Sequence, residues 1–292
     1  MTANGVCAVV ITYNPDGGFL ARARAIAQQV DDLVVVDNYS YSQPELRREC
    51  EVAGFGFIAN PQNLGVGVAL NQAVQWAQRR GFPWALFFDQ DSLPKPDCAA
   101  ELLAIAHAAG HVRPVGLVGA NYWDGSRGQY LVEPSSAQRW IETASVITSG
   151  SLLSIAAYKV AGPFREDFFI DSIDIEYALR LRAHGFAVLL SSKPLMNHAI
   201  GAPSRHRFLW KYVVCSNHSP MRRYYITRNR LIVVRSYFRR EPLWALKHLR
   251  GLVNHCVLTV LYEKERARKF RAIALGLCHG LRGVSGKLDR LL

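Results

Sequence analysis

The stretch from Trp84 to Asp91 reads WALFFDQD, so five apolar residues run directly into a pair of carboxylates. A continuous apolar run of this length is typical of a strand that is buried on both faces of a parallel sheet. The two acids then mark the carboxyl end of that strand, the place where open α/β sheets bind their ligands. This stretch therefore predicts an α/β fold and the edge of the sheet that carries its site.

The chain before this strand alternates short apolar strands with helices, an order typical of βαβ units and a parallel sheet. Polar clusters follow three of the strands: Thr12-Tyr13-Asn14, Asp37-Asn38 and Asp89-Gln90-Asp91. Because parallel strands end at one edge of a sheet, we expect these clusters to lie together. The expected strands are Cys7–Thr12, Leu33–Val36 and Gly56–Ala59, and the expected helices are Phe19–Val30, Gln43–Ala53 and Val66–Arg80.

The chain after Asp91 is first mixed and then helical, since beyond about Pro203 basic residues combine with Leu, Val, Trp and Tyr at helical spacing. The expected elements there are strands at Val115–Ala120, Ala144–Thr148, Leu152–Ile155 and Ala187–Leu190, and helices at Ser172–His184, Met221–Tyr237, Leu243–Lys264 and Glu265–Leu281.

The charge of the chain is unevenly distributed. The 292 residues carry a formal charge of +12, but residues 201–292 hold 20 Lys/Arg against 4 Asp/Glu, while the first 200 residues are net acidic. Such asymmetry indicates a body with a basic C-terminal region that meets something anionic: nucleic acid, a phosphate-bearing substrate or a membrane face.

The composition excludes several classes of protein. Half of the residues are hydrophobic and 20% are charged, which rules out intrinsic disorder. The six cysteines form no C-x-x-C pair, so a disulfide scaffold or a zinc ribbon is not expected. The N-terminus does not have the pattern of a signal peptide, and no apolar run is long enough to span a membrane.

The Asp89-Gln90-Asp91 cluster carries the clearest chemical signal. Two carboxylates at i and i+2 can bind one hard cation, with phosphate and sugar oxygens at its remaining positions. The alternative is a turn in which the two acids only accept hydrogen bonds from backbone amides.

Several motifs in chain order resemble glycosyltransferase family 2, the inverting GT-A enzymes that use nucleotide sugars. FFDQDS, FIDSIDIEY and RRYYITRN resemble the rhamnosyltransferase branch of this family, and the resemblance covers about residues 6–235. The motifs are VVITYN (9–14), VVDN (35–38), NLGVGVALN (63–71), FFDQDS (87–92), TSGS (148–151), FFIDSIDIEY (168–177), LRLRAHG (179–185), HAIG (198–201) and RRYYITRN (222–229).

This resemblance implies a GT-A fold with a mostly parallel central sheet, followed by a basic helical C-terminal region. The catalytic domain would span residues 1–202, with a donor half at about 1–98 and an acceptor half at about 99–202, and the basic region would span 203–292. It implies transfer of L-rhamnose from dTDP-L-rhamnose to a saccharide acceptor of a bacterial cell-surface glycan. A transferase of the same fold that uses another nucleotide sugar is the alternative.

The resemblance also assigns site residues. The cofactor would be Mg²⁺ or Mn²⁺, bound by Asp89, Asp91 and His198. For Asp37 the alternative is a helix N-cap. Nucleotide-sugar contacts fall on Thr12, Tyr13, Asn14, Asp37, Asn63, Gly65, Asn71, Asp89, Gln90 and Asp91, and acceptor or diphosphate contacts fall on Ser149, Gly150, Glu176, Arg222, Tyr224, Arg228 and Asn229.

Inversion requires a base that takes the proton of the acceptor hydroxyl. The resemblance places Asp174 in this role and leaves Asp171 as the alternative, because Ile173 stands where the family usually has Glu. Acids at the start of a helix are also favoured by its positive end, which is the structural alternative.

The C-terminal region predicts a further partner. An apolar stripe at Leu243, Leu246, Leu249, Leu252, Val253 and Val257, with the basic cluster Arg266, Arg268, Lys269 and Arg271, predicts peripheral binding to an anionic membrane. The enzyme would then act in the cytoplasm, at the inner face of the cytoplasmic membrane, on a lipid-linked acceptor. Packing on the protein itself or a homo-oligomer contact is the alternative, and nucleic-acid binding would leave the strand-end carboxylates without a purpose.

Overall fold

The computed structural model describes residues 3–125, 128–198, 204–208 and 211–289. The chain divides into two compact units, Met1–Phe164 with Tyr177–His198, and Arg165–Glu176 with Ala199–Leu292. Among the described residues, no helix combines the length and the apolar character needed to cross a membrane.

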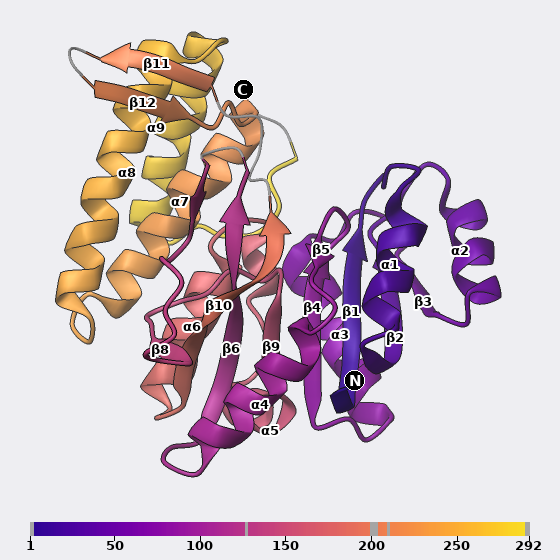
Figure 1. Ribbon diagram of the computed structural model, residues 1–292. Helices are drawn as coiled ribbons and strands as arrows, with labels where there is room; N and C mark the ends of the chain where they lie inside the picture. Colours follow the sequence, from indigo (N-terminus) through magenta and orange to yellow (C-terminus); the bar gives the residue numbers. More distant parts are fainter. Residues whose placement is uncertain (1–2, 126–127, 199–203, 209–210, 290–292) are drawn as a thin grey trace. The chain divides into compact units, whose positions relative to one another are not determined.

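The first unit is built on one sheet with the strand order β3-β2-β1-β4-β9-β6-β10-β5, and the expected α/β fold is confirmed (Figure 1). β1 lies parallel between β2 and β4, and β9 then enters antiparallel to β4. The strands are β1 (Ala3–Thr12), β2 (Val30–Asp37), β3 (Gly56–Ala59), β4 (Trp84–Asp89), β5 (Leu93–Pro94), β6 (Val115–Asp124), β7 (Gln129–Tyr130), β8 (Trp140–Glu142), β9 (Ser151–Ser154) and β10 (Ala187–His198). The helices are α1 (Phe19–Ala27), α2 (Gln43–Val52), α3 (Val66–Arg79), α4 (Cys98–Gly110) and α5 (Ile155–Ala161).

The apolar runs of the sequence account for the centre of this sheet. Consecutive residues from Val6 to Val10 in β1 are all at most 1% exposed, so both faces of the strand are covered. The register sets Thr12 beside Asp37 and Ile11 beside Asp89. Three strand ends therefore meet at one edge, as the polar clusters of the sequence predict.

The second unit contains three long helices that contact one another, α7 (Pro220–Tyr237), α8 (Pro242–Tyr262) and α9 (Arg266–Arg282) (Figure 1). It also contains the antiparallel pair β11 (Ser204–Phe208) and β12 (Lys211–Cys215) and the segment 165–176, with the short 3₁₀ helix Glu166–Phe168. The helix α6 (Ile173–Ala183) begins in this segment and ends in the first unit.

α7 and α9 approach closely because α9 presents glycines to α7. A Cβ atom on Gly276 would lie 2.8 Å from the carbonyl oxygen of Tyr224, and one on Gly280 would lie 3.0 Å from that of Arg228. Between the helices, the buried Glu263 binds both Arg223 and Lys269, which satisfies charges that would otherwise be costly to bury.

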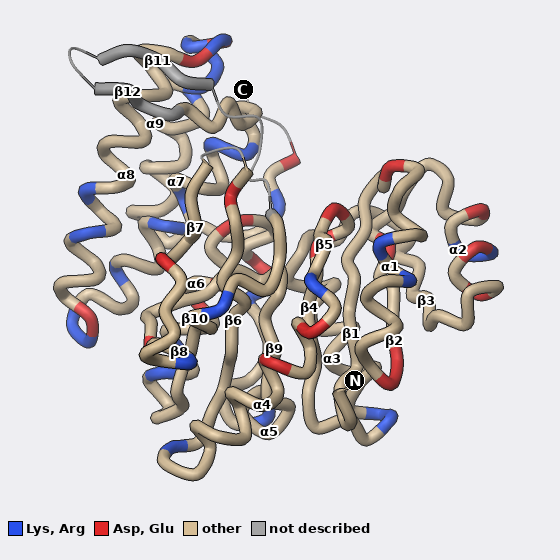
Figure 2. Tube along the Cα trace, viewed as in Figure 1, with Lys and Arg blue, Asp and Glu red and all other residues tan. Residues whose placement is uncertain are grey.

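α8 presents an apolar face to solvent. Leu243, Leu246 and Val253 are 82%, 52% and 57% exposed, and the helix contains no acidic residue, as Figure 2 shows along its length. Two residues of the predicted membrane surface lie elsewhere. Leu252 is buried on the inner side of α8, and Lys269 is buried at Glu263.

Two sequence-based expectations of secondary structure were wrong. Residues 144–148 are irregular rather than a strand, and the buried side chain of Val146 covers Gly119, where a Cβ would lie 2.6 Å from it. The nearby strand is β8, which pairs with β10. Beyond residue 203 the chain forms the pair β11–β12 before the helices begin, whereas the composition indicated helices alone.

We expect Gly276→Ala to lower the free energy of unfolding by about 1–3 kcal/mol, because the added methyl group meets backbone atoms of α7 that cannot move independently. Gly251→Ala is the matched control on α8, where nothing lies within 4 Å, and it should raise the stability by about 0.5–1 kcal/mol through helix propensity. Urea unfolding followed by circular dichroism measures both. Equal effects of the two substitutions would contradict the packing described for α9.

Candidate functional site

Asp37 is the hub of the strand ends in the first unit. Its carboxylate is fully buried and accepts hydrogen bonds from the hydroxyl of Thr12 at 2.8 Å, from the backbone and side chain of Ser40, and from the amide of Gln43. The N-cap of α2 is Ser42, so Asp37 does not cap that helix. A buried carboxylate with this many donors is rigid, and it fixes the ends of β1 and β2 relative to each other.

The turn after β1 is fixed to the turn after β4. The backbone amide of Tyr13 donates to the side-chain oxygen of Gln90 at 2.8 Å, and Arg22 of α1 donates to the Gln90 carbonyl at 2.9 Å. Asn14 has a positive φ of 49°, and its side chain accepts from the backbone amide of Tyr41 at 2.9 Å. The structure therefore brings Thr12, Tyr13, Asn14, Asp37 and Gln90 together, as the sequence predicts.

The turn into α3 borders the same edge of the sheet. The amide of the buried Asn38 donates to the carbonyl of Gly65 at 3.1 Å, and its oxygen accepts from the side chain of Asn60 and the backbone of Leu64. Gly65 has a φ of 90°, which glycine adopts readily, and its amide donates to Asn63. Asn63 and Gly65 thus belong to the strand-end cluster.

Asn71 lies apart from this cluster, although the resemblance assigns it to the donor. It is 2% exposed on α3, and both ends of its amide are bonded to the backbone of Phe164, with Tyr158 as a further donor. In the structure it therefore joins α3 to the segment 158–164.

Asp89 and Asp91 project from the end of β4 and are both exposed. The turn below them is held by Ser149, whose hydroxyl accepts from the amide of Asp89 at 3.3 Å and contacts Ser92. Gly150 has a φ of 72°, and a Cβ there would lie 2.5 Å from the sulfur of Met196. Ser149 therefore bonds the turn that carries Asp89 and Asp91, and Gly150 allows the close packing next to it.

Two exposed carboxylates at one strand end fit a Mg²⁺ or Mn²⁺ ion whose other ligands come from a bound diphosphate, since Mg²⁺ is commonly held by one or two carboxylates together with substrate phosphates. Among the described residues, no group of three or more Asp, Glu, His or Cys could hold a metal without such help. The side chain of His198, the predicted third ligand, lies outside what the structure describes.

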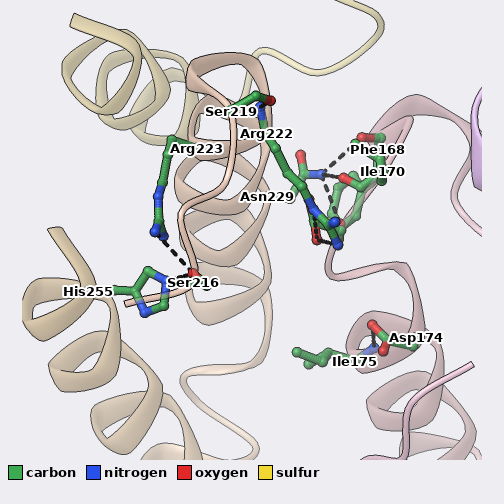
Figure 3. A network of polar contacts seen from close by, with 11 residues as sticks. Phe168, Ile170, Asp174, Ile175, Ser216, Ser219, Arg222, Arg223, Asn229 and His255 are labelled. Atoms are coloured by element: carbon green, nitrogen blue, oxygen red, sulfur yellow. Dashed lines mark hydrogen bonds and ion pairs between the residues drawn. The ribbon is translucent and has the colours of Figure 1, made fainter. Parts of the chain in front are cut away.

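In the second unit, the loop 168–172 carries Asp171 in a strained backbone. Phe169, Asp171 and Ser172 all have φ between 63° and 65°, although none is glycine. The side-chain amide of Asn229 donates to the carbonyls of Phe168, Ile170 and Asp171 at 2.8–3.0 Å (Figure 3). A strained loop persists only where its surroundings hold it, and Asn229 supplies that restraint.

Arg228 completes the restraint. It donates to the carbonyls of Asp167 and Phe168 at 3.2 Å and to the carbonyl of Gly286, and its planar group faces the ring of Tyr224. The resemblance assigned Tyr224, Arg228 and Asn229 to a diphosphate or acceptor. The structure differs, because all three are at most 1% exposed and bind the protein's own backbone or rings.

Arg222 pairs with Asp171 in the same loop. Its Nε and one terminal nitrogen each donate to a different carboxylate oxygen at 3.2 Å (Figure 3). Burial raises the pKa of the Asp171 carboxyl, and the Arg222 guanidinium opposes this by favouring the charged form. The pair thus sets a mostly buried carboxylate, whose pKa is raised by burial, against a partly exposed arginine.

The other two acids of this motif have different surroundings. Asp174 is partly exposed in the first turn of α6, and its carboxylate accepts from the amide of Ile175 at 2.8 Å. Glu176 is 6% exposed and accepts from the hydroxyl of Tyr237 at 3.1 Å, so it is buried rather than presented to a ligand.

Sequence reasoning missed the residues that hold the turns in place. Arg22 donates to the carbonyl of Gln90, Ser40 accepts from the amide of Asn14, and Asn60 donates to Asn38, so each joins a cluster residue from another part of the chain. Asn38, by contrast, belongs to a predicted polar cluster, because it directly follows Asp37 at a strand end.

Comparisons with known proteins agree with this architecture. Residues 7–147 match the family model described as glycosyl transferase family 2. The chain is 26% identical, over 306 aligned positions and 97% of both chains, to a dTDP-rhamnosyl transferase, RfbF, of Shigella flexneri.

Solved structures of S. aureus TarS share the fold. One has a TM-score of 0.62 at 14% identity and covers 93% of this chain, which itself spans 48% of that TarS chain. TarS 1–349 in complex with UDP-GlcNAc has a TM-score of 0.61 at 14% identity and covers 96% of this chain and 81% of its own.

We expect Arg222→Gln to raise the pKa of Asp171 further, because the substitution removes the positive charge that favours the carboxylate. Asp171 should then take up its proton at a higher pH than in the unmodified protein. Titration of ¹³C-labelled aspartate carboxyl groups by NMR measures the shift. Arg239→Gln, at an exposed arginine beyond α7, is the control and should leave the titration unchanged.

Proposed function

We propose that this protein, whose residues 7–147 match the family model described as glycosyl transferase family 2, moves L-rhamnose from dTDP-L-rhamnose to a saccharide acceptor during synthesis of a bacterial cell-surface glycan. The choice of sugar is supported by the similarity to the dTDP-rhamnosyl transferase RfbF along the whole chain. The observation that carries the proposal is the cluster of strand ends, where Thr12, Asp37 and the carboxylate turn of β4 meet at one edge of the sheet.

This edge offers what a nucleotide sugar requires. The buried Asp37 and Asn38 hold the neighbouring turns rigid, and a site whose turns are fixed before binding loses little entropy when it binds the base and ribose. The exposed carboxylates Asp89 and Asp91 suit a diphosphate that brings a divalent cation.

We propose that the transfer is a single displacement with inversion. The acceptor oxygen attacks the anomeric carbon, the bond from that carbon to the diphosphate oxygen breaks, and its electron pair leaves with the diphosphate. The carboxylate of Asp174 takes the proton of the acceptor hydroxyl. Arg222 and Asn229 keep the preceding loop in place, and Asp171 is the alternative base.

We propose Mg²⁺ or Mn²⁺ as the cofactor, with Asp89, Asp91 and His198 as its protein ligands. When bound, the ion would neutralise the charge that develops on the leaving diphosphate. Asp91 would supply a direct carboxylate ligand, and its exposure at the end of β4 leaves room for the donor phosphates.

We further propose that the enzyme works on a lipid-linked acceptor at the inner face of the cytoplasmic membrane. The exposed apolar face of α8 supports this, since it combines Leu243, Leu246, Val253 and Val257 with cations and no acid. A second copy of the chain is a poor occupant of this face, because two-fold pairing would set its cations against each other.

The donor is tested by incubating the protein with a panel of nucleotide sugars and Mn²⁺ and measuring release of nucleoside diphosphate. We expect dTDP from dTDP-L-rhamnose, and loss of this release with a chelator. Asp174→Asn should lower turnover by about 10²-fold or more, the scale of general-base catalysis, while dTDP affinity stays unchanged.

Asp171→Asn is the comparison for that experiment and should have the milder effect. If no donor of the panel releases nucleoside diphosphate, the enzyme proposal is refuted. Release from a different sugar nucleotide alone would reassign the donor. Parallel loss of affinity and turnover in Asp174→Asn would give Asp174 a structural role.

Membrane contact is tested by co-sedimentation with vesicles containing anionic lipid. We expect binding at low salt that weakens as salt rises, since each cation near the surface contributes about 1 kcal/mol. The triple variant Leu243→Glu/Leu246→Glu/Val253→Glu should bind at least about tenfold more weakly, because three charges would enter the interface.

Its control carries the same three charges on the first unit, at Val52, Val112 and Val160, which are 80%, 91% and 59% exposed. This control should bind vesicles as the unmodified protein does. Equal losses in both variants, or no binding at low salt, would refute the membrane role of α8.

A further inference from the structure

The second unit contains a cavity of about 820 Å³ between the first turn of α7 and the first half of α9. Met221, Ala272 and Leu275 line its inner part, and Ser219 and Phe270 lie among its more exposed wall residues. Its size falls in the range of pockets that bind small organic molecules, about 300–1,000 Å³.

The inner wall of this cavity is apolar and firmly supported. Met221 and Leu275 pack against the buried cluster of Tyr224, Tyr225 and Ala272. Phe270 is 57% exposed at the edge, so its ring offers additional apolar contact area to a ligand in the cavity. The wall therefore suits a hydrocarbon chain.

The rim is cationic. Arg268 and Arg271 line the cavity, and none of its lining residues is acidic. Within the part of the chain that the structure describes, Arg268 pairs only with the exposed Glu265, at 3.5 Å, and Arg271 makes no ion pair. The start of α7, an 18-residue helix, adds its positive end to the same wall. A ligand for this rim carries negative charge.

We infer that the cavity binds an amphiphilic anion, a lipid whose single long apolar chain ends in a phosphate or diphosphate. The chain would lie over Met221 and Leu275, and the phosphate would bind Arg268 and Arg271, whose planar donor groups match phosphate oxygens. The cationic rim favours an anionic head group. Inorganic phosphate alone would make no contact with the apolar wall, so the ligand needs both parts.

The position of the cavity connects it to the acceptor side, and in this respect the inference rests on the proposed function. Met221 directly precedes Arg222, which pairs with Asp171, and Phe169 and Ile170 of the same loop pack on the cluster below the cavity. A lipid held here would anchor its attached saccharide to the unit that carries the candidate base.

The test measures binding of farnesyl phosphate by titration calorimetry, below its micelle concentration and without any sugar nucleotide. We expect a Kd in the range of tens of micromolar, as ligand efficiency suggests for a molecule of about 20 non-hydrogen atoms. Farnesol and inorganic phosphate should each bind at least about tenfold more weakly, because each lacks one half of the interaction.

Two variants locate the site. Arg271→Gln should weaken farnesyl phosphate binding about fivefold or more, and Ala274→Phe, which fills the cavity from its exposed rim, should weaken it about tenfold or more. Arg282→Gln and Ala267→Phe make the same changes at exposed positions of α9 that do not line the cavity, and they should bind normally.

Three outcomes overturn the inference: no binding of farnesyl phosphate, equal binding of farnesol, or equal losses in the cavity and control variants. Binding of inorganic phosphate as tight as that of farnesyl phosphate would reduce the site to a simple anion site. Because no donor is present, these results stand apart from the rhamnosyl proposal. Release of dTDP from the donor should also persist in Ala274→Phe.

Discussion

The parallel register of β1 with both β2 and β4 is the constraint on which the first unit depends. A strand that is buried on both faces accepts only apolar residues along its length, so polar chemistry is confined to the point where the strand leaves the sheet. The register then sets Thr12 beside Asp37 and Ile11 beside Asp89. The packing of the strands therefore places the polar residues of this unit at one edge of the sheet. The buried hydrogen bonds of Asp37 make that edge rigid.

In the second unit, α7 has a comparable organising role through residues on different sides of one helix. Arg223 faces Ser216 and the buried Glu263, whereas Arg222 and Asn229 face the loop with Asp171 (Figure 3). The buried Arg228 donates to backbone carbonyls, so its N–H groups find acceptors and the carbonyls find donors. The RRYYITRN motif thus acts largely on the protein itself, and only Arg222 among its predicted ligand contacts is presented at the surface.

The strands and the strand-end site could be predicted because both follow from local apolar runs and the residues after them. The roles of Asn71 and Asn229 could not, since their partners are carbonyl groups 58 to 93 residues away in sequence. Val146 shows the converse limit. Its segment has the β-branched composition of a strand, but in the structure it is irregular, and the Val146 side chain packs over Gly119. The local sequence pattern predicts which helices and strands form, whereas tertiary contacts decide which groups the polar side chains bind.

The hydrogen bonds from Asn229 to the 168–171 loop also govern when that loop can form. The amide that restrains it lies 58 to 61 residues later in the chain, and Arg228 binds Gly286 near the C-terminus. During synthesis from the N-terminus, β1 to β4 are complete long before these donors emerge from the ribosome. The strained loop gains its restraint only after Arg228, Asn229 and Gly286 have been made. The strand-end cluster and the loop that carries Asp171 therefore depend on parts of the chain that are made at different times.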